Sequence, residues 1–253
     1  MPKRCLDASN YDSDKAEHSH YLRNYEECFQ PLWNKEIRLL ELGIYKGGSL
    51  LLWRDYFEKG LIVGLDVQPV EIEDSTGRVR TYQGMQQDTD LLDRIGRETA
   101  PHGFDVIIDD CSHIGELTRI SFWHLFDNHL KSGGIYVIED WSASYWDSWF
   151  DGVSFQAPAK KKFSPLLFRG RSALASGQRK VPVLNPIFRA TKRLLNHGQF
   201  RTHQYGLAGF IKELVDECAM ADITRVDRGK TPYRPSKFME MRILPGQVFI
   251  MKA

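Results

Sequence analysis

Two pairs of adjacent carboxylates follow apolar runs in the sequence. The run FDVIIDDCSH ends in Asp109 and Asp110, with His113 three residues after the second carboxylate. The run GGIYVIEDW ends in Glu139 and Asp140. Apolar runs of this kind predict buried strands of a parallel sheet, and ligands bind outside the carboxyl ends of such strands. We therefore expect the four carboxylates to gather in one crevice.

Four anions in one crevice repel each other unless a cation or a proton compensates them. A hard divalent cation bound by oxygen ligands, with positions left for water or substrate, meets this need. The pattern predicts a magnesium site, with manganese or calcium as alternatives. The competing interpretation is that the acids only cap strand ends and bind basic loops. His113 is the natural general base, since imidazole titrates near neutral pH; a purely structural histidine is its alternative.

A glycine-containing turn and a later carboxylate indicate a nucleoside site. LLELGIYKGGSLLLW reads as a buried strand ending at Glu41, a turn from Gly43 and a helix from Ser49. The next strand ends in Asp66, where a carboxylate can accept hydrogen bonds from both ribose hydroxyls. The spacing G-x-x-x-G-G differs from the diphosphate fingerprint G-x-G-x-x-G, and a Walker lysine is absent. We therefore expect S-adenosylmethionine; the alternative is an ordinary turn of a doubly wound fold.

Strand and helix patterns alternate around these motifs. The apolar runs IRLLEL, LIVGLD, RVRTY, FDVIID and GIYVIED are separated by amphipathic stretches at 49–58, 88–98 and 115–130. This alternation predicts an α/β fold with a doubly wound, Rossmann-like parallel sheet. An amphipathic helix over 15–33 precedes it. A helix near 207–220, a strand near 223–227, a long hairpin-like connection and an antiparallel last strand QVFIMK complete it.

The chain divides into four expected segments. Four prolines between residues 158 and 186 interrupt regular structure, so we expect an insertion over the carboxyl edge of the sheet. The segments are an N-terminal helical cap at 1–34, a cofactor- and metal-binding α/β core at 35–151, a basic lid at 152–205, and a C-terminal helix with strands at 206–253.

The charge is segregated along the chain. The 253 residues are 42% hydrophobic and 26% charged, which excludes a disordered, collagenous or disulfide-scaffold protein. The net charge of +1 conceals 15 basic and 27 acidic residues over 1–151 and 12 basic with no acidic residues over 152–212. The basic block is suited to an anionic glycan, to a lipid-linked sugar at a membrane face, or to the acidic core of the same chain.

The cysteines and the apolar runs bear on localisation. Cys5, Cys28, Cys111 and Cys218 are far apart and form no CxxC pair, so neither a zinc site nor a disulfide framework is expected. The N-terminus lacks a signal-peptide pattern, and no run approaches the roughly 18 apolar residues of a spanning helix. We expect a cytoplasmic protein, at most peripherally membrane-associated.

Five ordered motifs over residues 12–147 resemble a known family. They are Asp14-Lys15 with His18, Tyr21 and Tyr25, then ELGIYKGGSLLLWRDYF, GMQQD, IIDDCSH and YVIEDWSASYW. They resemble the magnesium-dependent sugar O-methyltransferases that act on macrolides such as mycinamicin and tylosin. Rhamnosyl O-methyltransferases and proteins labelled cephalosporin hydroxylase are similar.

The resemblance implies roles for individual residues. It implies that Asp110, Glu139 and Asp140 ligate the metal and that His113 is the base. It also implies that the residues around S-adenosylmethionine are Glu41, Gly43, Ser49, Asp66, Gln86, Asp88 and Asp109. Aromatic faces suit sugar or macrocycle surfaces, so we expect substrate contacts at Trp141 and Tyr145, joined by His18 and Tyr21 from the N-terminal helix; packing is the alternative. The resemblance further implies a sheet of the class I methyltransferase type and a homo-oligomer.

The expected reaction is metal-dependent methyl transfer from S-adenosylmethionine to a hydroxyl of a glycoside, a natural-product sugar, a polysaccharide or a glycolipid. A catechol-type O-methyltransferase would use similar cofactor and metal chemistry. An iron-dependent hydroxylase would need a two-histidine, one-carboxylate set, which is not evident. A nucleic-acid-binding protein would use the basic block at 152–212 but would leave the carboxylate crevice unexplained.

Overall fold

The structure is a computed structural model of the chain and describes residues 4–13, 15, 19–153, 203–227 and 232–253. Residues up to Val153 and from Gln204 onward belong to one compact unit, which is the unit described below. The expected basic lid and His18 lie outside the described residues, apart from the lid's outermost positions.

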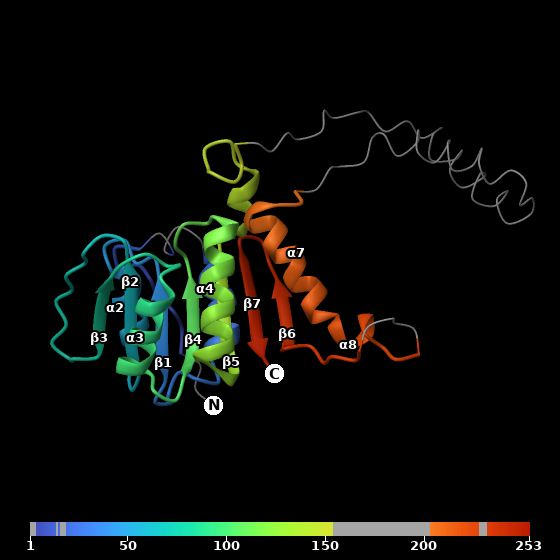
Figure 1. The fold of residues 1–253 in the computed structure, drawn as a ribbon. Coiled ribbons are helices and arrows are strands. Elements are labelled where there is room, and N and C mark those ends of the chain that lie inside the picture. Colours follow the sequence, from blue (N-terminus) through green and yellow to red (C-terminus); the bar gives the residue numbers. More distant parts are fainter. Residues whose placement is uncertain (1–3, 14, 16–18, 154–202, 228–231) are drawn as a thin grey trace, which may run out of the picture. The chain divides into compact units, whose positions relative to one another are not determined.

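A seven-stranded sheet in the order β3-β2-β1-β4-β5-β7-β6 forms the centre of this unit (Figure 1). The first five strands pair in parallel, and β7 pairs antiparallel with both β5 and β6. The strands are β1 (Arg38–Leu42), β2 (Leu61–Asp66), β3 (Val79–Gln83), β4 (Phe104–Asp109), β5 (Leu130–Glu139), β6 (Phe238–Ile243) and β7 (Gln247–Lys252). The strand order reverses at β1 and β4, and that switch point is where open α/β sheets bind ligands. The predicted doubly wound sheet with an antiparallel last strand is confirmed.

Helices cover both faces of the sheet. They are α1 (Ser19–Phe29), α2 (Gly48–Tyr56), α3 (Thr89–Thr99), α4 (Gly115–Asn128), a 3₁₀ helix (Trp141–Tyr145), α7 (Gly206–Cys218) and the short α8 (Met220–Ile223). The helices predicted at 49–58, 88–98, 115–130 and 207–220 are thus confirmed. The N-terminal helix is shorter than the predicted 15–33, because the chain turns after Phe29, next to Pro31, whose ring disfavours helical geometry in the residue before it.

Each face of the sheet has its own apolar core. Phe122 of α4 and Phe210 of α7 pack with residues of α3 against one face. Tyr25 of α1 and Trp53 of α2 pack against the other. Neighbouring residues of β1 alternate between the two cores, as the period of two along a strand requires, and this explains why the central strands read as unbroken apolar runs.

The strand predicted near 223–227 is wrong. Residues 220–223 form α8, and the Thr224 hydroxyl donates to the Met220 carbonyl at 2.7 Å, which extends the helical turn. The β-branched residues there favoured a strand only by local propensity. The sixth strand is instead Phe238–Ile243, inside the segment predicted as a connection. It is an edge strand with exposed residues such as Met239, so the apolar alternation that would have identified it is weak.

Asp151 joins the beginnings of two helices. Its Oδ2 accepts the backbone amides of Gly115 in α4 and Leu207 in α7, both at 2.8 Å. The first amides of a helix have no partner within the helix and carry partial positive charge, so a carboxylate is a favourable partner. The Ser144 hydroxyl accepts the Ala208 amide at 3.0 Å in the same way. The loop after β5 is therefore tied to α4 and α7.

Among the described residues, no helix is both long and apolar enough to cross a bilayer. All four cysteines are free thiols.

Candidate active site

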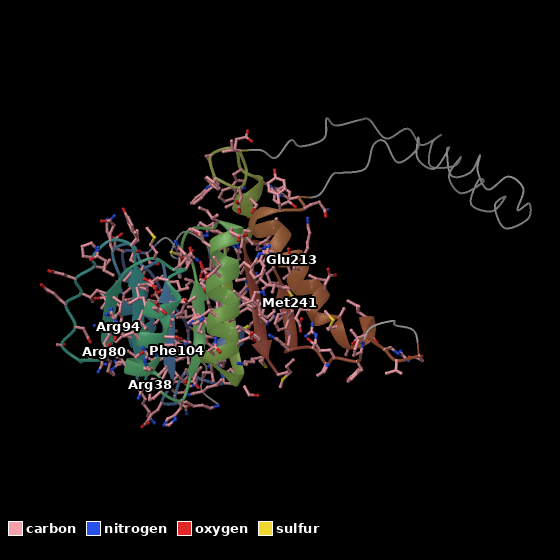
Figure 2. The ribbon with its side chains drawn as sticks, viewed as in Figure 1. Arg38, Arg80, Arg94, Phe104, Glu213 and Met241 are labelled. Carbon is pink, nitrogen blue, oxygen red and sulfur yellow. The ribbon has the colours of Figure 1, made fainter. Side chains whose placement is uncertain are left out.

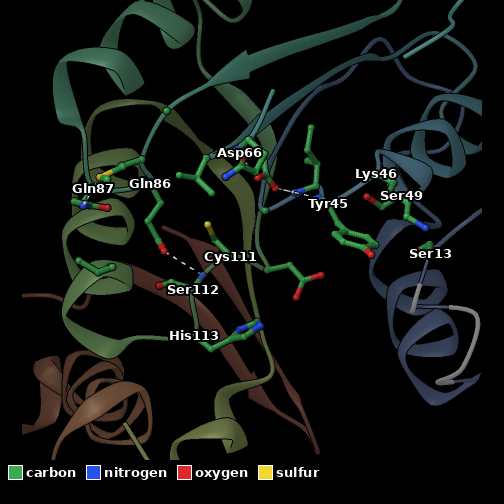
Figure 3. A pocket seen from close by; sticks show the side chains of 18 of the residues that line it. Ser13, Tyr45, Lys46, Ser49, Asp66, Gln86, Gln87, Cys111, Ser112 and His113 are labelled. Atoms are coloured by element: carbon green, nitrogen blue, oxygen red, sulfur yellow. Dashed lines mark hydrogen bonds between the residues drawn. The ribbon is translucent and has the colours of Figure 1, made fainter. Parts of the chain in front are cut away.

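A pocket of about 960 Å³ opens where β1, β2, β3 and β4 end (Figure 3). This volume lies within the usual range for cofactor and small-molecule sites. Six of the residues predicted from sequence line it, namely Gly43, Ser49, Asp66, Gln86, Asp110 and His113. The structure thus brings residues of the predicted nucleoside motif to a single cavity with Asp110 and His113.

The turn after β1 is shaped by Gly43 and fastened by Asp66. Gly43 has a φ of 81°, and a Cβ there would collide with the backbone of Asp110. The Asp66 carboxylate accepts the amides of Ile44 at 2.9 Å and Tyr45 at 3.0 Å, and its other oxygen accepts the Gln68 amide at 3.0 Å (Figure 3). A carboxylate has about four acceptor positions. Asp66 therefore orients the turn and retains acceptor capacity toward the pocket.

Asp109 lies beneath the pocket and acts on it through Gln86. The Gln86 amide nitrogen contacts Asp109 at 3.3 Å, and its oxygen accepts the Ser112 amide at 3.2 Å (Figure 3). The hydroxyls of Ser121 and Tyr136 also donate to Asp109, at 3.2 and 3.3 Å. Burial raises the pKa of Asp109 to about 7. This network holds the turn after β4 in place.

The other two predicted cofactor residues differ in position. Glu41 is fully buried, and one of its oxygens accepts the Ser49 hydroxyl at 2.7 Å. Its second oxygen has no hydrogen-bond partner among the described residues. Asp88 is exposed, caps α3 by accepting the Leu91 amide at 3.1 Å, and is not among the residues that line the pocket.

Lys15 places a buried positive charge among three of the carboxylates. Its ammonium, on a side chain 1% exposed, lies 2.7 Å from Asp110, 3.1 Å from Glu139 and 3.6 Å from Glu41. Burial opposes the charge, but the three carboxylates outweigh it and hold the pKa of Lys15 well above its ordinary value. Glu139 also accepts the Tyr25 hydroxyl. Both oxygens of Glu139 are thus engaged by residues that precede the sheet.

Asp140 faces α1. It accepts the Tyr21 hydroxyl at 2.6 Å, and burial together with this contact raises the pKa of Tyr21. Tyr25 and Phe29 of the same helix are fully buried against Trp53. The helix therefore packs on the sheet and also directs two hydroxyls at the carboxylates after β5.

One ligand atom from each of Asp110, His113 and Asp140 lies within 4.8 Å of the others. His113 and Asp140 have positive φ values of 53° and 50°, and Tyr45, which also lines the pocket, has a φ of 48°. In the described part of the chain these are the non-glycine residues with positive φ. Such backbone is costly and is found where a site requires it.

The donor set fits a divalent cation. Glu41, Asp110, Glu139 and Asp140 bring four carboxyl groups to one crevice, against the single ammonium of Lys15 among the described side chains that contact them. Burial, followed by the charge of Asp110, raises the pKa of Glu139 well above its ordinary value, so the crevice is short of positive charge. Oxygen-rich sites of this kind suit magnesium or manganese.

The aromatic residues after β5 divide between packing and the site. The Trp141 indole donates to the Leu244 carbonyl at 2.9 Å, which anchors the loop. Tyr145 is half-buried in the same loop. The ring of Trp149, which is 36% exposed, lies edge-to-face with His113 at 5.0 Å between centroids. Trp149 is thus placed beside the predicted base.

Lys15 was assigned no role from the sequence, although it belongs to the N-terminal motif, and Tyr25 was expected to cover the cofactor or to pack on the sheet rather than to bind a carboxylate. Four carboxylates in one crevice require positive charge, and this requirement was the available signal for Lys15. The sequence analysis assigned that charge to a metal ion alone. Tyr25 fits the helical apolar pattern, so its hydroxyl carried no separate signal.

No family model matches the chain. It is 42% identical over 147 residues to mycinamicin VI 2''-O-methyltransferase of Micromonospora griseorubida, covering 55% of this chain and 36% of that protein. It is 40% identical over 130 residues to demethylmacrocin O-methyltransferase of Streptomyces fradiae, covering 49% and 32%. The chain spans about a third of the length of these relatives. The expected resemblance to sugar O-methyltransferases is confirmed.

The fold is similar to a solved structure. MycE methyltransferase from the mycinamycin biosynthetic pathway, in complex with Mg and SAH, matches 99% of this chain and 55% of its own chain, with a TM-score of 0.69 and 27% identity. A further MycE structure contains Mg, SAH and mycinamycin VI, and matches 92% and 48% with a TM-score of 0.63. The sheet is thus a Rossmann-like methyltransferase sheet, as predicted.

Proposed function

We propose that this chain transfers a methyl group from S-adenosylmethionine to a sugar hydroxyl in a reaction that depends on a divalent cation, with magnesium first and manganese as an alternative. The observation that carries the proposal is the meeting of a cofactor-sized pocket with the Asp110, His113 and Asp140 cluster at one sheet edge. The names and bound groups of the similar proteins support it.

The cofactor side of the pocket is formed by the turns after β1 and β2. Gly43 lets the backbone approach a ligand closely, and Asp66 supplies an acceptor for ribose hydroxyls. Gln86 and Asp109 hold the turn after β4 in place. Glu41 lies buried behind this side of the pocket, where one of its oxygens accepts the Ser49 hydroxyl and the other faces the Lys15 ammonium at 3.6 Å, so it orients Ser49.

The reaction side is formed by the turns after β4 and β5. A bound divalent cation, held by Asp110 and Asp140 with Glu139 behind them, would lower the proton affinity of a sugar hydroxyl, and S-adenosylmethionine would supply the methyl group. His113 lies close enough to both carboxylates to take the proton of a hydroxyl positioned there. Lys15 and Tyr25 hold Glu139, and Tyr21 orients Asp140.

The acceptor is proposed to contact the aromatic loop after β5. Trp149 offers a half-exposed face beside His113, and sugar rings stack on such faces. We also propose that Tyr21, Trp141 and Tyr145 contact the acceptor. The Trp141 ring is held in place by the hydrogen bond from its indole. The basic block at 152–212, most of which lies outside the described residues, is proposed to select among acceptors.

The decisive experiment is a methyl-transfer screen with labelled S-adenosylmethionine. Macrolide glycosides, deoxysugar glycosides and polysaccharide fragments would be tested with and without Mg²⁺, with a catechol series alongside. Transfer to a glycoside that requires the metal supports the proposal. Full activity in EDTA would exclude the metal, and preference for catechols would favour the alternative O-methyltransferase.

We also infer a homo-oligomer in a reducing, cytoplasmic compartment. Homo-oligomers are implied by the family resemblance, and the four free thiols support the compartment. Light scattering on the purified chain tests the first inference, and fractionation of the producing cells tests the second. Vesicle sedimentation would show whether the protein also contacts membranes or lipid-linked sugars.

A further inference from the structure

A second cluster of histidine and carboxylate lies at the opposite edge of the sheet from the pocket. His124 of α4 and His129, which follows α4, both direct Nε2 at Oδ1 of Asp93 in α3, at 2.9 and 2.7 Å. His129 directly precedes β5, and its carbonyl accepts the amide of Phe104, the first residue of β4 (Figure 2). α4 begins at the pocket, and its 14 residues span about 21 Å, so the two sites are well separated.

The local structure makes room for this cluster. A Cβ at Gly96, in the interior of α3, would collide with the His129 ring. Glycine lowers helix stability at an interior position, so its presence here accommodates the imidazole. The His129 amide also donates to the Leu125 carbonyl at 2.8 Å, which fixes the backbone that carries the ring. The two rings lie 5.5 Å apart between centroids.

The three donors converge from separate segments of the chain. One ligand atom of each of Asp93, His124 and His129 lies within 4.8 Å of the others. Donor atoms on one tetrahedral zinc ion lie about 3.3 Å apart. The Asp93 oxygen is 2.9 and 2.7 Å from the two imidazole nitrogens, so it would have to move back by about half an ångström to admit an ion. Contact with His129 lowers the pKa of the Asp93 carboxyl, so the ionised form that a metal requires is favoured.

The donor chemistry selects a different metal from the pocket. Two imidazoles and one carboxylate suit zinc and neighbouring transition metals, whereas magnesium prefers oxygen ligands alone. All three residues are only partly buried, so an ion has access and a water can complete its coordination. Asp93 belongs to α3, His124 to α4, and His129 caps the end of α4 directly before β5, so one ion would link α3 to the end of α4.

We propose that Asp93, His124 and His129 form a second metal site that binds a transition-metal ion of the zinc type and stabilises the amino edge of the sheet. This site is independent of the proposed methyl transfer. Its alternative is a hydrogen-bonded cluster in which both neutral imidazoles donate to Asp93 and no metal binds.

The test is zinc titration calorimetry on protein freed of metal with EDTA, performed in excess Mg²⁺. The Asp110→Asn variant serves as background, so that zinc binding in the pocket is weakened. We expect one bound zinc ion per chain. The double variant His124→Gln with His129→Gln in that background should bind zinc at least about tenfold more weakly. His102→Gln, which changes an exposed histidine outside the cluster, is the matched control and should bind as the background does.

Thermal unfolding gives a second measurement that does not involve activity. Zinc should raise the unfolding temperature of the background protein and of the His102→Gln control, and should leave that of the double variant unchanged. The proposal is overturned if the background protein binds no zinc, or if the double variant loses less than about tenfold in affinity. Circular dichroism before the titration checks that each variant is folded.

Discussion

Two clusters of histidine and carboxylate occupy opposite edges of one sheet, and they differ in the backbone that carries them. At the carboxyl edge, His113 and Asp140 both have left-handed backbone, with φ values of 53° and 50°. At the amino edge, Asp93 and His124 lie within regular helices. Strained backbone persists only where the surrounding structure enforces it. The difference agrees with the two proposals, a reaction at the carboxyl edge and a link between helices at the amino edge.

The electrostatic surroundings differ as well. The carboxyl edge buries Lys15 among three carboxylates, where solvent cannot screen the charges. Asp93 is about a third exposed, and its partners are the imidazoles of His124 and His129 rather than a buried ammonium. Changes at the first cluster should therefore affect both chemistry and folding, and changes at the second should affect folding alone.

The largest expected effect is that of Asp110→Asn. This change removes a proposed ligand charge, so methyl transfer should fall by at least about 100-fold and its dependence on Mg²⁺ should disappear. Initial rates over a magnesium titration measure both. Asp93→Asn, the matched change at the amino edge, should retain the wild-type rate. Equal losses in the two variants would remove the distinction between the clusters.

His113→Ala should lower kcat by about 100- to 10,000-fold while leaving the affinity for S-adenosylmethionine unchanged, since the imidazole is proposed to act on the acceptor proton alone. Single-turnover rates and cofactor titration measure the two quantities. Magnesium affinity distinguishes a general base from a metal ligand. Loss of a base should leave the affinity for magnesium unchanged, whereas loss of a ligand should lower it. An unchanged kcat would exclude His113 from the mechanism.

Lys15→Met tests the buried charge. Removing one partner of a buried ionic cluster leaves the others uncompensated and typically costs about 3–5 kcal/mol. The free energy of unfolding in urea should fall by about that amount. Lys46→Met is the control, because Lys46 forms an exposed pair with Asp12, and it should change stability by less than about 0.5 kcal/mol. If Mg²⁺ fully restores the stability that Lys15→Met loses, the Lys15 ammonium and the metal ion compensate the same carboxylates.

The smallest expected effect is that of Asp93→Asn on stability without zinc. An asparagine oxygen still accepts a hydrogen bond, so the free energy of unfolding should fall only slightly, and by much less than in Lys15→Met. Urea unfolding in EDTA measures it. A loss as large as that of Lys15→Met would show that the amino edge is as strongly coupled as the carboxyl edge.

Much of the fold could be predicted from the sequence, because buried parallel strands have a clear apolar pattern. The strand ends at Asp66, Asp109 and Glu139 were predicted correctly for this reason. The edge strand Phe238–Ile243 was missed, since half of an edge strand faces solvent and its pattern is weak.

The sequence predicted several of the residues that meet at the site, but not the contacts that they make. The sequence indicated which residues would meet at the carboxyl edge, and Asp110 and His113 do meet there. It did not indicate that Asp66 would bind the amides of the turn, nor that Lys15 would reach across the sheet. Such contacts join residues far apart in the chain, and no local spacing encodes them.

The hydrogen bonds of Asp151 to the starts of α4 and α7 have a consequence for how chains with this fold diversify. Asp151 lies three positions before residue 154, and its carboxylate binds the start of α7, where the chain continues at Leu207, as well as the start of α4. A segment whose two attachment points are joined in this way can be lengthened, shortened or exchanged between genes without altering the sheet. Selection can then change this segment, and with it the proposed acceptor, while the residues proposed for methyl transfer are inherited intact.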